Sequence, residues 1–160
     1  MDGRLDATDS SLAATGTLAN ALTMYAGDRD GTDNGDEFSG DIDEVKVFRA
    51  ALTLDQVKVD YNAGAGLNAA TGTIESSQLL DGSGTAAIME WKLDENTGTT
   101  ANDTTGNANT GTITNATFTT GYNGSGLNLD GSGDYASIAD DADLDFAAAD
   151  SYTIETWFRH

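Results

Sequence analysis

The sequence predicts an all-β protein, an antiparallel sandwich with one short helix. Short apolar stretches are separated, roughly every ten residues, by turn signals such as Asp-Gly, Asn-Gly and Gly-Ser. Several of these stretches alternate apolar and polar residues, as strands with one buried face do. The chain also has 19 Gly and no Pro, which suits many short strands joined by tight turns.

Strands are expected at residues 18–25, 40–48, 87–93, 111–118, 126–129, 135–138 and 152–159. In the last of these, alternation places Ile154 and Phe158 on one face and Thr153, Glu155 and Trp157 on the other.

Turns and core positions follow from residue type. Asp2-Gly3 and Asp130-Gly131 are predicted to form hairpin turns, because Gly adopts positive φ at little cost. Trp91 and Phe48 are assigned to the core, where large aromatic side chains in strands usually lie.

The short helix is predicted near residues 54–61. Thr53 is placed to cap its first turn, with Gln56 three residues further on as in a capping box. Gly64 is placed to end it. Residues 65–84 are small and polar and are interpreted as a linker, with an ordinary long loop as the alternative.

Composition excludes several classes of function. The net charge of −20 repels nucleic acid phosphates and anionic membrane surfaces. No apolar run approaches the roughly 20 residues of a membrane span, so membrane insertion is not expected. The absence of Cys excludes disulfides, thiolate chemistry and Cys-based zinc sites, and the single His is His160.

Catalysis is not expected either. A pair of acids on one strand serves acid–base chemistry only when both point to the same face, and adjacent residues do not. In the segment Ile42-Asp43-Glu44-Val45 the two acids are adjacent. The chain also has no Gly-rich loop ending in Lys that would hold a phosphate. The prediction is therefore a protein that is not an enzyme.

Two passages resemble the laminin-G-like, concanavalin A-like jelly-roll superfamily in its bacterial tandem form. Residues 35–64, with Phe-x-Gly-x-Ile-Asp-Glu-Val and a short helix, resemble the segment that closes such a module. Residues 86–138, with Trp-x-Leu-Asp-Glu and Gly-x-x-Leu-x-Leu-Asp-Gly-x-x-Asp-Tyr, resemble the segment that opens one. Residues 152–159 resemble the strand that follows. The resemblance therefore implies a jelly-roll β-sandwich.

In this chain the closing half comes first. Residues 1–64 are interpreted as the end of one module, 65–84 as a linker and 85–160 as the start of the next. The alternative is a circular permutant, in which both halves pack as one sandwich. Because the first and last strands of the family are neighbours, strands 40–48 and 87–93 are expected to pair antiparallel in either case.

The resemblance implies a non-catalytic module of a large secreted or cell-surface bacterial protein that binds glycans or extracellular proteins in adhesion. The alternatives are a calcium-stabilised structural spacer in an adhesin and an accessory module of a glycoside hydrolase. Glycan binding uses exposed aromatic rings, although strand aromatics lie more often in the core. The rings available for it are Tyr25, Tyr122, Tyr135, Tyr152 and Trp157.

A structural Ca²⁺ is also implied by the resemblance, because related sandwiches tie their first strand to their last with oxygen ligands around such an ion. The matching positions are Asp94 and Asp43, with Asp103 as a third candidate. The alternative for Asp43 and Asp94 is that each carboxylate accepts hydrogen bonds from loop amides.

Overall fold

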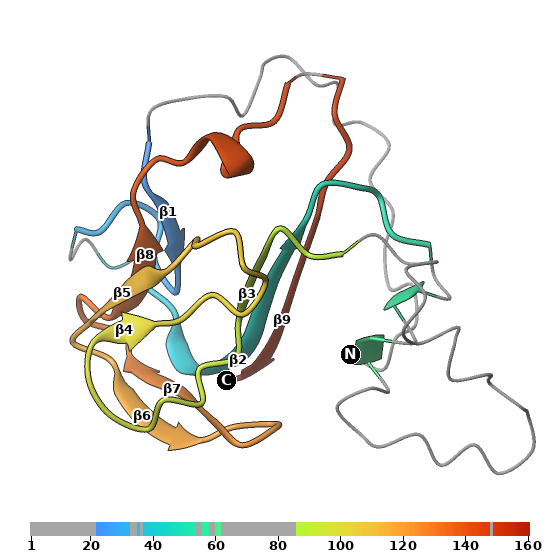
Figure 1. Cartoon of the computed structure of the whole chain (residues 1–160). Helices are drawn as coiled ribbons and strands as arrows, with labels where there is room; N and C mark the ends of the chain where they lie inside the picture. Colours follow the sequence, from blue (N-terminus) through green and yellow to red (C-terminus); the bar gives the residue numbers. More distant parts are fainter. Residues whose placement is uncertain are drawn as a thin grey trace, which may run out of the picture.

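The structure, a computed structural model, describes residues 22–32, 35, 37–53, 56–57, 60–61, 86–147 and 149–160. Within these residues the chain is nearly all β and forms two antiparallel sheets, the predicted all-β sandwich (Figure 1). None of the helical segments among them has the length and apolar character needed to cross a membrane.

Sheet A contains, in order, β1 (Met24–Ala26), β8 (Tyr135–Ile138), β5 (Gly111–Thr114) and β4 (Thr100–Ala101). Sheet B contains, in order, β3 (Met89–Trp91), β2 (Ser39–Phe48), β7 (Ser125–Asp130) and β6 (Thr117–Thr120). The last strand, β9 (Thr153–Arg159), pairs with the edge of β2 that faces away from both β3 and β7. A single 3-10 turn at Ala142–Leu144 lies between β8 and β9.

Strand β2 is the centre of sheet B, and its pairing confirms one prediction. Val45 lies opposite Trp91 in an antiparallel ladder, so the strands predicted at 40–48 and 87–93 are neighbours. Strand β1 pairs in the same way with β8 of sheet A. Both sheets are therefore built from strands on either side of residues 62–85, a stretch that includes the predicted linker and lies outside the described residues.

The core lies between the sheets around Trp91, whose side chain is fully buried as predicted. Its indole Nε1 donates a hydrogen bond to the backbone oxygen of Asn109 at 2.7 Å. Gly111 at the start of β5 lies against the ring, since a Cβ there would be 2.4 Å from Trp91 Cζ2. Phe48 is also buried, as expected.

Some strand boundaries differ from the sequence prediction. The strand expected at 111–118 is two strands, β5 and β6, because Asn115 adopts a positive φ of 57° and turns the chain. The strand expected at 18–25 is described only from residue 22, and β1 begins at Met24. The short strand β4 and the 3-10 turn were not predicted.

The hairpin predicted at Asp130-Gly131 is wrong, although Gly131 does adopt a positive φ of 85°. The turn joins β7 to β8, and these strands belong to different sheets. A local turn signal fixes the bend of the chain but not the sheet that the next strand enters. The other predicted hairpin, at Asp2-Gly3, lies outside the described residues.

A β-bulge in β2 decides which side chains reach the outer face of sheet B, the face turned away from sheet A. The ladder with β9 shifts between Asp43, opposite Trp157, and Lys46, opposite Glu155. Glu44 is the extra residue of the bulge, and its backbone has a positive φ of 51°. Residues three apart normally point to opposite faces, but the bulge places Asp43 and Lys46 on the same one.

The inner face of β9 is partly exposed. Ile154 and Phe158 share one face, as the alternation predicted, and they lie opposite Val47 and Ile42 on the core side of the sheet. Their side chains are nevertheless 59% and 54% exposed, respectively. Strand β9 therefore extends beyond the part of sheet B that the described residues of sheet A cover.

Candidate functional site

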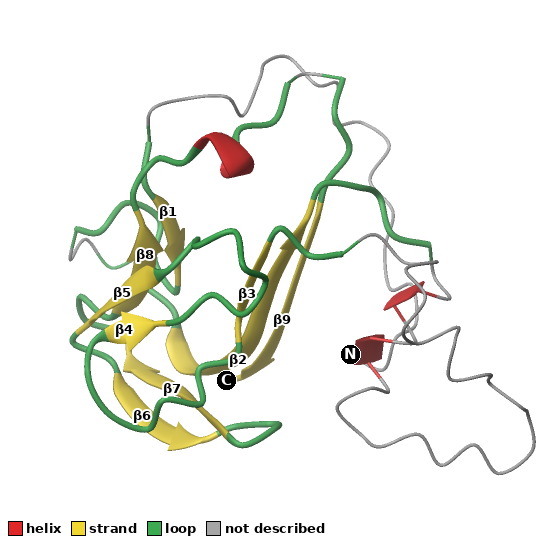
Figure 2. Ribbon diagram, viewed as in Figure 1, coloured by secondary structure: helices red, strands yellow, loops and turns green. Residues whose placement is uncertain are grey.

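The candidate site lies on the outer face of sheet B, beneath the segment that follows β2. Thr53 N donates to Gln56 Oε1 at 2.8 Å and Gln56 N donates to Thr53 Oγ1 at 3.3 Å, which confirms the predicted capping box. Residues 56–57 and 60–61 are helical, and the intervening residues of the predicted helix lie outside the described ones. Figure 2 shows these helical residues on the side of sheet B away from sheet A.

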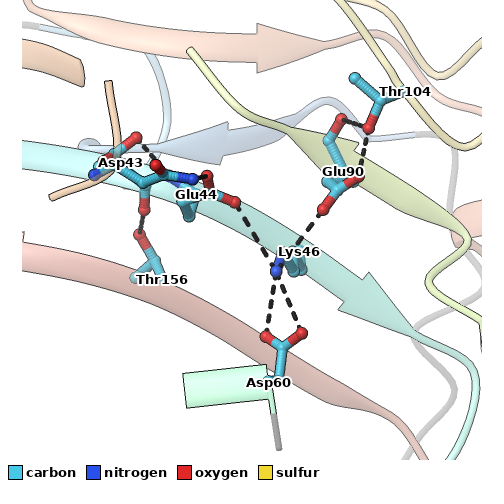
Figure 3. Close-up of polar contacts among 8 residues, drawn as sticks. Asp43, Glu44, Lys46, Asp60, Glu90, Thr104 and Thr156 are labelled. Atoms are coloured by element: carbon cyan, nitrogen blue, oxygen red, sulfur yellow. Dashed lines mark hydrogen bonds and ion pairs between the residues drawn. The ribbon is translucent and has the colours of Figure 1, made fainter. Parts of the chain in front are cut away.

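Lys46 is the centre of a charged cluster on this face (Figure 3). Its Nζ lies 3.0 Å from Asp60 Oδ2, 3.5 Å from Glu90 Oε1 and 3.6 Å from Glu44 Oε2. Only 13% of the Lys46 side chain is exposed. Burial works to lower the pKa of Lys46, but attraction to these carboxylates outweighs it and the pKa is raised.

Glu155 of β9 joins the cluster beside Asp60. Burial and the negative charge of Asp60 raise the pKa of Glu155 to about 8, against the opposing charge of Lys46. Its Oε1 is buried and has no hydrogen-bond partner among the described residues. The pKa of Glu44 is raised as well, chiefly by burial. Among the described residues, the cluster therefore holds more carboxylates than the one ammonium of Lys46 balances.

Three aromatic rings gather next to this cluster. The ring of Tyr122 stacks on Trp157 with centroids 3.5 Å apart and planes 10° apart. The ring of Tyr61 also packs against Trp157, with ring centroids 4.9 Å apart. Tyr122 remains 43% exposed. Of the rings proposed for glycan binding, Tyr122 and Trp157 therefore come together on one face.

The other predicted rings lie elsewhere. Tyr25 and Tyr135 meet edge to face on sheet A with centroids 5.2 Å apart. Tyr152 is 45% exposed and packs against Phe146, with centroids 5.1 Å apart. These three rings lie outside the Tyr122–Trp157 stack.

The loop between β6 and β7, residues 121–124, is held by the two acids proposed as calcium ligands. Asp43 Oδ2 accepts a hydrogen bond from Asn123 N at 3.0 Å, and Asp94 Oδ1 accepts one from Ser125 N at 2.8 Å. Asp43 Oδ1 accepts a third from Glu44 N at 2.8 Å. Burial raises the pKa of Asp43 despite these bonds, and the negative charge of Asp94 adds to the effect. The predicted convergence of Asp43 and Asp94 occurs, with backbone amides of the loop as their partners.

Two glycines allow this approach. A Cβ on Gly121 would lie 2.5 Å from Asp43 Oδ2, and one on Gly124 would lie 2.0 Å from Asp94 Oδ1. Gly124 also has a positive φ of 77°. The sequence Gly121-Tyr-Asn-Gly124 is therefore the local signal for a loop that two carboxylates contact closely.

Asp103 serves a different loop. Its carboxylate accepts hydrogen bonds from the backbone N–H groups of Glu90, Thr105 and Asn109, each within 3.1 Å. Although burial opposes the change, these bonds lower the pKa of Asp103. No group of three or more His, Cys, Asp or Glu side chains suited to a metal ion occurs in the part of the chain that the structure describes. Calcium binding by Asp43, Asp94 and Asp103 stays a prediction.

Sequence reasoning missed the Lys46 cluster, because its members come from β2, β3, β9 and the segment after β2. A weak signal was present: Lys46 is the only basic residue in the predicted strand 40–48.

The chain was compared with family models, curated proteins and solved structures, and none of them matches it.

Proposed function

We propose that the chain is a non-catalytic ligand-binding module that takes part in adhesion as part of a secreted or cell-surface bacterial protein. The location rests on the sequence resemblance. The observation that carries binding is the stack of Tyr122 on Trp157 beside the carboxylates of the outer face. Aromatic rings pack against the apolar faces of sugar rings, and carboxylates accept hydrogen bonds from hydroxyl groups. A glycan is the ligand that this combination favours, and an extracellular protein is the second.

The arrangement of the acids supports binding without catalysis. Both oxygens of Asp43 accept backbone N–H groups, so this carboxylate has a structural role in the loop. Glu44 is engaged by Asn123 Nδ2 at 3.2 Å and by Lys46. Neither acid is an isolated group facing an open cleft.

Replacing Tyr122 with Ala should abolish glycan binding, because the substitution removes the exposed ring of the stack. Binding is measured on a glycan array and then by calorimetry with the best glycan. The control is Tyr152→Ala, since Tyr152 is as exposed as Tyr122, 45% against 43%, but lies outside the stack. Equal binding by the two variants would contradict the site, and the absence of any bound glycan or extracellular protein would contradict the function.

A calcium-stabilised spacer is the second candidate function, favoured by the convergence of Asp43 and Asp94 on one loop. Millimolar Ca²⁺ should then raise the melting temperature above that in NaCl of the same ionic strength. A site saturated at about 100 times its dissociation constant adds roughly 2.7 kcal/mol to the free energy of unfolding. The Ca²⁺ increment should disappear in Asp94→Ala and persist in Asp103→Ala if the ion lies at the loop. Equal melting temperatures in the two salts would remove this function.

A further inference from the structure

The carboxylate of Glu44 lies between an amine and a carboxamide that come from different parts of the fold. Its Oε2 lies 3.6 Å from Nζ of Lys46 on the same strand (Figure 3). Its Oε1 accepts a hydrogen bond at 3.2 Å from Nδ2 of Asn123, in the loop between β6 and β7. The side chains of Lys46 and Glu44 are only 13% and 10% exposed, respectively. One largely buried acid therefore contacts both groups.

Asn123 is also held in place through its backbone. Its N–H group donates to Asp43 Oδ2 at 3.0 Å, and the N–H group of Ser125 donates to Asp94 Oδ1 at 2.8 Å. These bonds tie the loop to β2 and to the chain just after β3, so the carboxamide of Asn123 stays beside β2. Holding two groups in fixed positions near each other raises their effective concentration for a reaction between them.

We propose that Lys46 and Asn123 form an intramolecular amide cross-link, with Glu44 carrying protons from one to the other. Nζ of Lys46 passes a proton to Glu44 and attacks Cγ of Asn123 as a free amine. The Nζ–Cγ bond forms and the Cγ–Nδ2 bond breaks. Of the three protons of the lysine ammonium, one stays on the new amide and two pass through Glu44 to the leaving nitrogen. That nitrogen departs as ammonium, so the reaction needs no oxidant or further reactant.

The contacts match these proton transfers. Oε2 of Glu44 faces the amine that must lose protons, and Oε1 faces the nitrogen that must gain them. Nζ lies at the end of a flexible four-carbon stem, which lets it turn from Glu44 to Cγ of Asn123. Asn123 is exposed, so the ammonium has a path to solvent. Asp60 and Glu90 attract the charged form of Nζ at 3.0 and 3.5 Å, and the reaction is therefore slow.

The cross-link goes beyond ligand binding and does not depend on it. It joins β2 covalently to the loop of residues 121–124, which carries the exposed ring of Tyr122. Like a disulfide, it removes conformational freedom from the unfolded chain and so stabilises the fold. Because its test contains no ligand, failure of the cross-link and failure of glycan binding are distinguishable.

Mass spectrometry of the purified full chain, incubated at neutral pH and then denatured, tests the cross-link. We expect a species that is lighter by one molecule of ammonia and that increases with time. Trypsin cleaves after Lys and Arg, so the cross-link should block cleavage after Lys46 and join residues 30–49 to residues 93–159. Cyclisation of Asn123 onto the backbone nitrogen of Gly124 also releases ammonia, but it leaves these two peptides separate. The joined peptide is therefore the decisive signal.

Two variants should not form the joined peptide. Lys46→Arg keeps the positive charge but replaces the amine with a guanidinium that stays protonated. Glu44→Gln keeps the shape of the side chain but cannot carry protons. Glu90→Gln is the matched control, because it removes a carboxylate beside Nζ and leaves the three reacting groups intact, so it should form the cross-link faster. Absence of the joined peptide from the wild-type chain, or its formation in Glu44→Gln at the wild-type rate, would overturn the proposal.

Discussion

Replacing Lys46 with Met is expected to lower the free energy of unfolding by about 3–5 kcal/mol, the usual effect of removing one partner from a buried ion pair. Lys46 is 13% exposed and lies within 3.6 Å of three carboxylates. Met fills a similar volume but leaves those carboxylates without the ammonium of Lys46. Urea denaturation at neutral pH measures the loss.

Lys92→Met is the control for this prediction, because Lys92 lies just after the same strand as Glu90 and is exposed. It should change stability by less than about 0.5 kcal/mol. The loss in Lys46→Met should also shrink as the pH falls from neutral to about 5, because burial raises the pKa of Glu44 and its protonation removes a negative charge that Lys46 would balance. A Lys46→Met protein as stable as Lys92→Met would show that the cluster contributes nothing to folding.

Gly124→Ala is expected to cost about 3 kcal/mol. The positive φ of 77° alone costs an Ala roughly 1–2 kcal/mol. The new Cβ would also lie 2.0 Å from Asp94 Oδ1, and relieving such a contact adds roughly 1–3 kcal/mol. Thermal or urea denaturation measures the sum.

Gly98→Ala separates the two contributions, since Gly98 has a similar φ of 87° but nothing within 4 Å of a Cβ. It should show only the backbone cost. The double variant Gly124→Ala, Asp94→Ala should be less destabilised than the sum of its single variants, because the clash needs both residues. Strict additivity would mean that Asp94 does not approach the loop at Gly124.

Sequence patterns predicted the elements whose signals are local. Alternation located β2, β8 and β9 to within a residue or two, and the Thr53–Gln56 spacing predicted the capping box that forms. The pairing of β2 with β3 was predicted from the family resemblance, although the two strands lie on opposite sides of residues 62–85. The convergence of Asp43 and Asp94 followed from that pairing.

Features that depend on distant contacts were not predicted. The adjacent acids Asp43 and Glu44 interrupt the alternation of strand 40–48, but the bulge that places Asp43 and Lys46 on the same face was not predicted from them. Asn115 is a residue type that tolerates positive φ, and the turn that it makes divides one predicted strand into two. The Lys46 cluster needed the register of three strands and the position of Asp60. Local residue type does not encode the assembly of this cluster.

The central place of β2 also has a kinetic consequence. Strand β2 is synthesised in the first third of the chain, but Asp41 pairs with Arg159, 118 residues later. The residues of β7 that pair with β2 also come late in the sequence. Closing such long loops is slow, and chains dominated by distant pairings fold slowly. During synthesis on the ribosome, one edge of β2 therefore stays unpaired until β9 has been made. Sheet B is completed only after translation has passed residue 159.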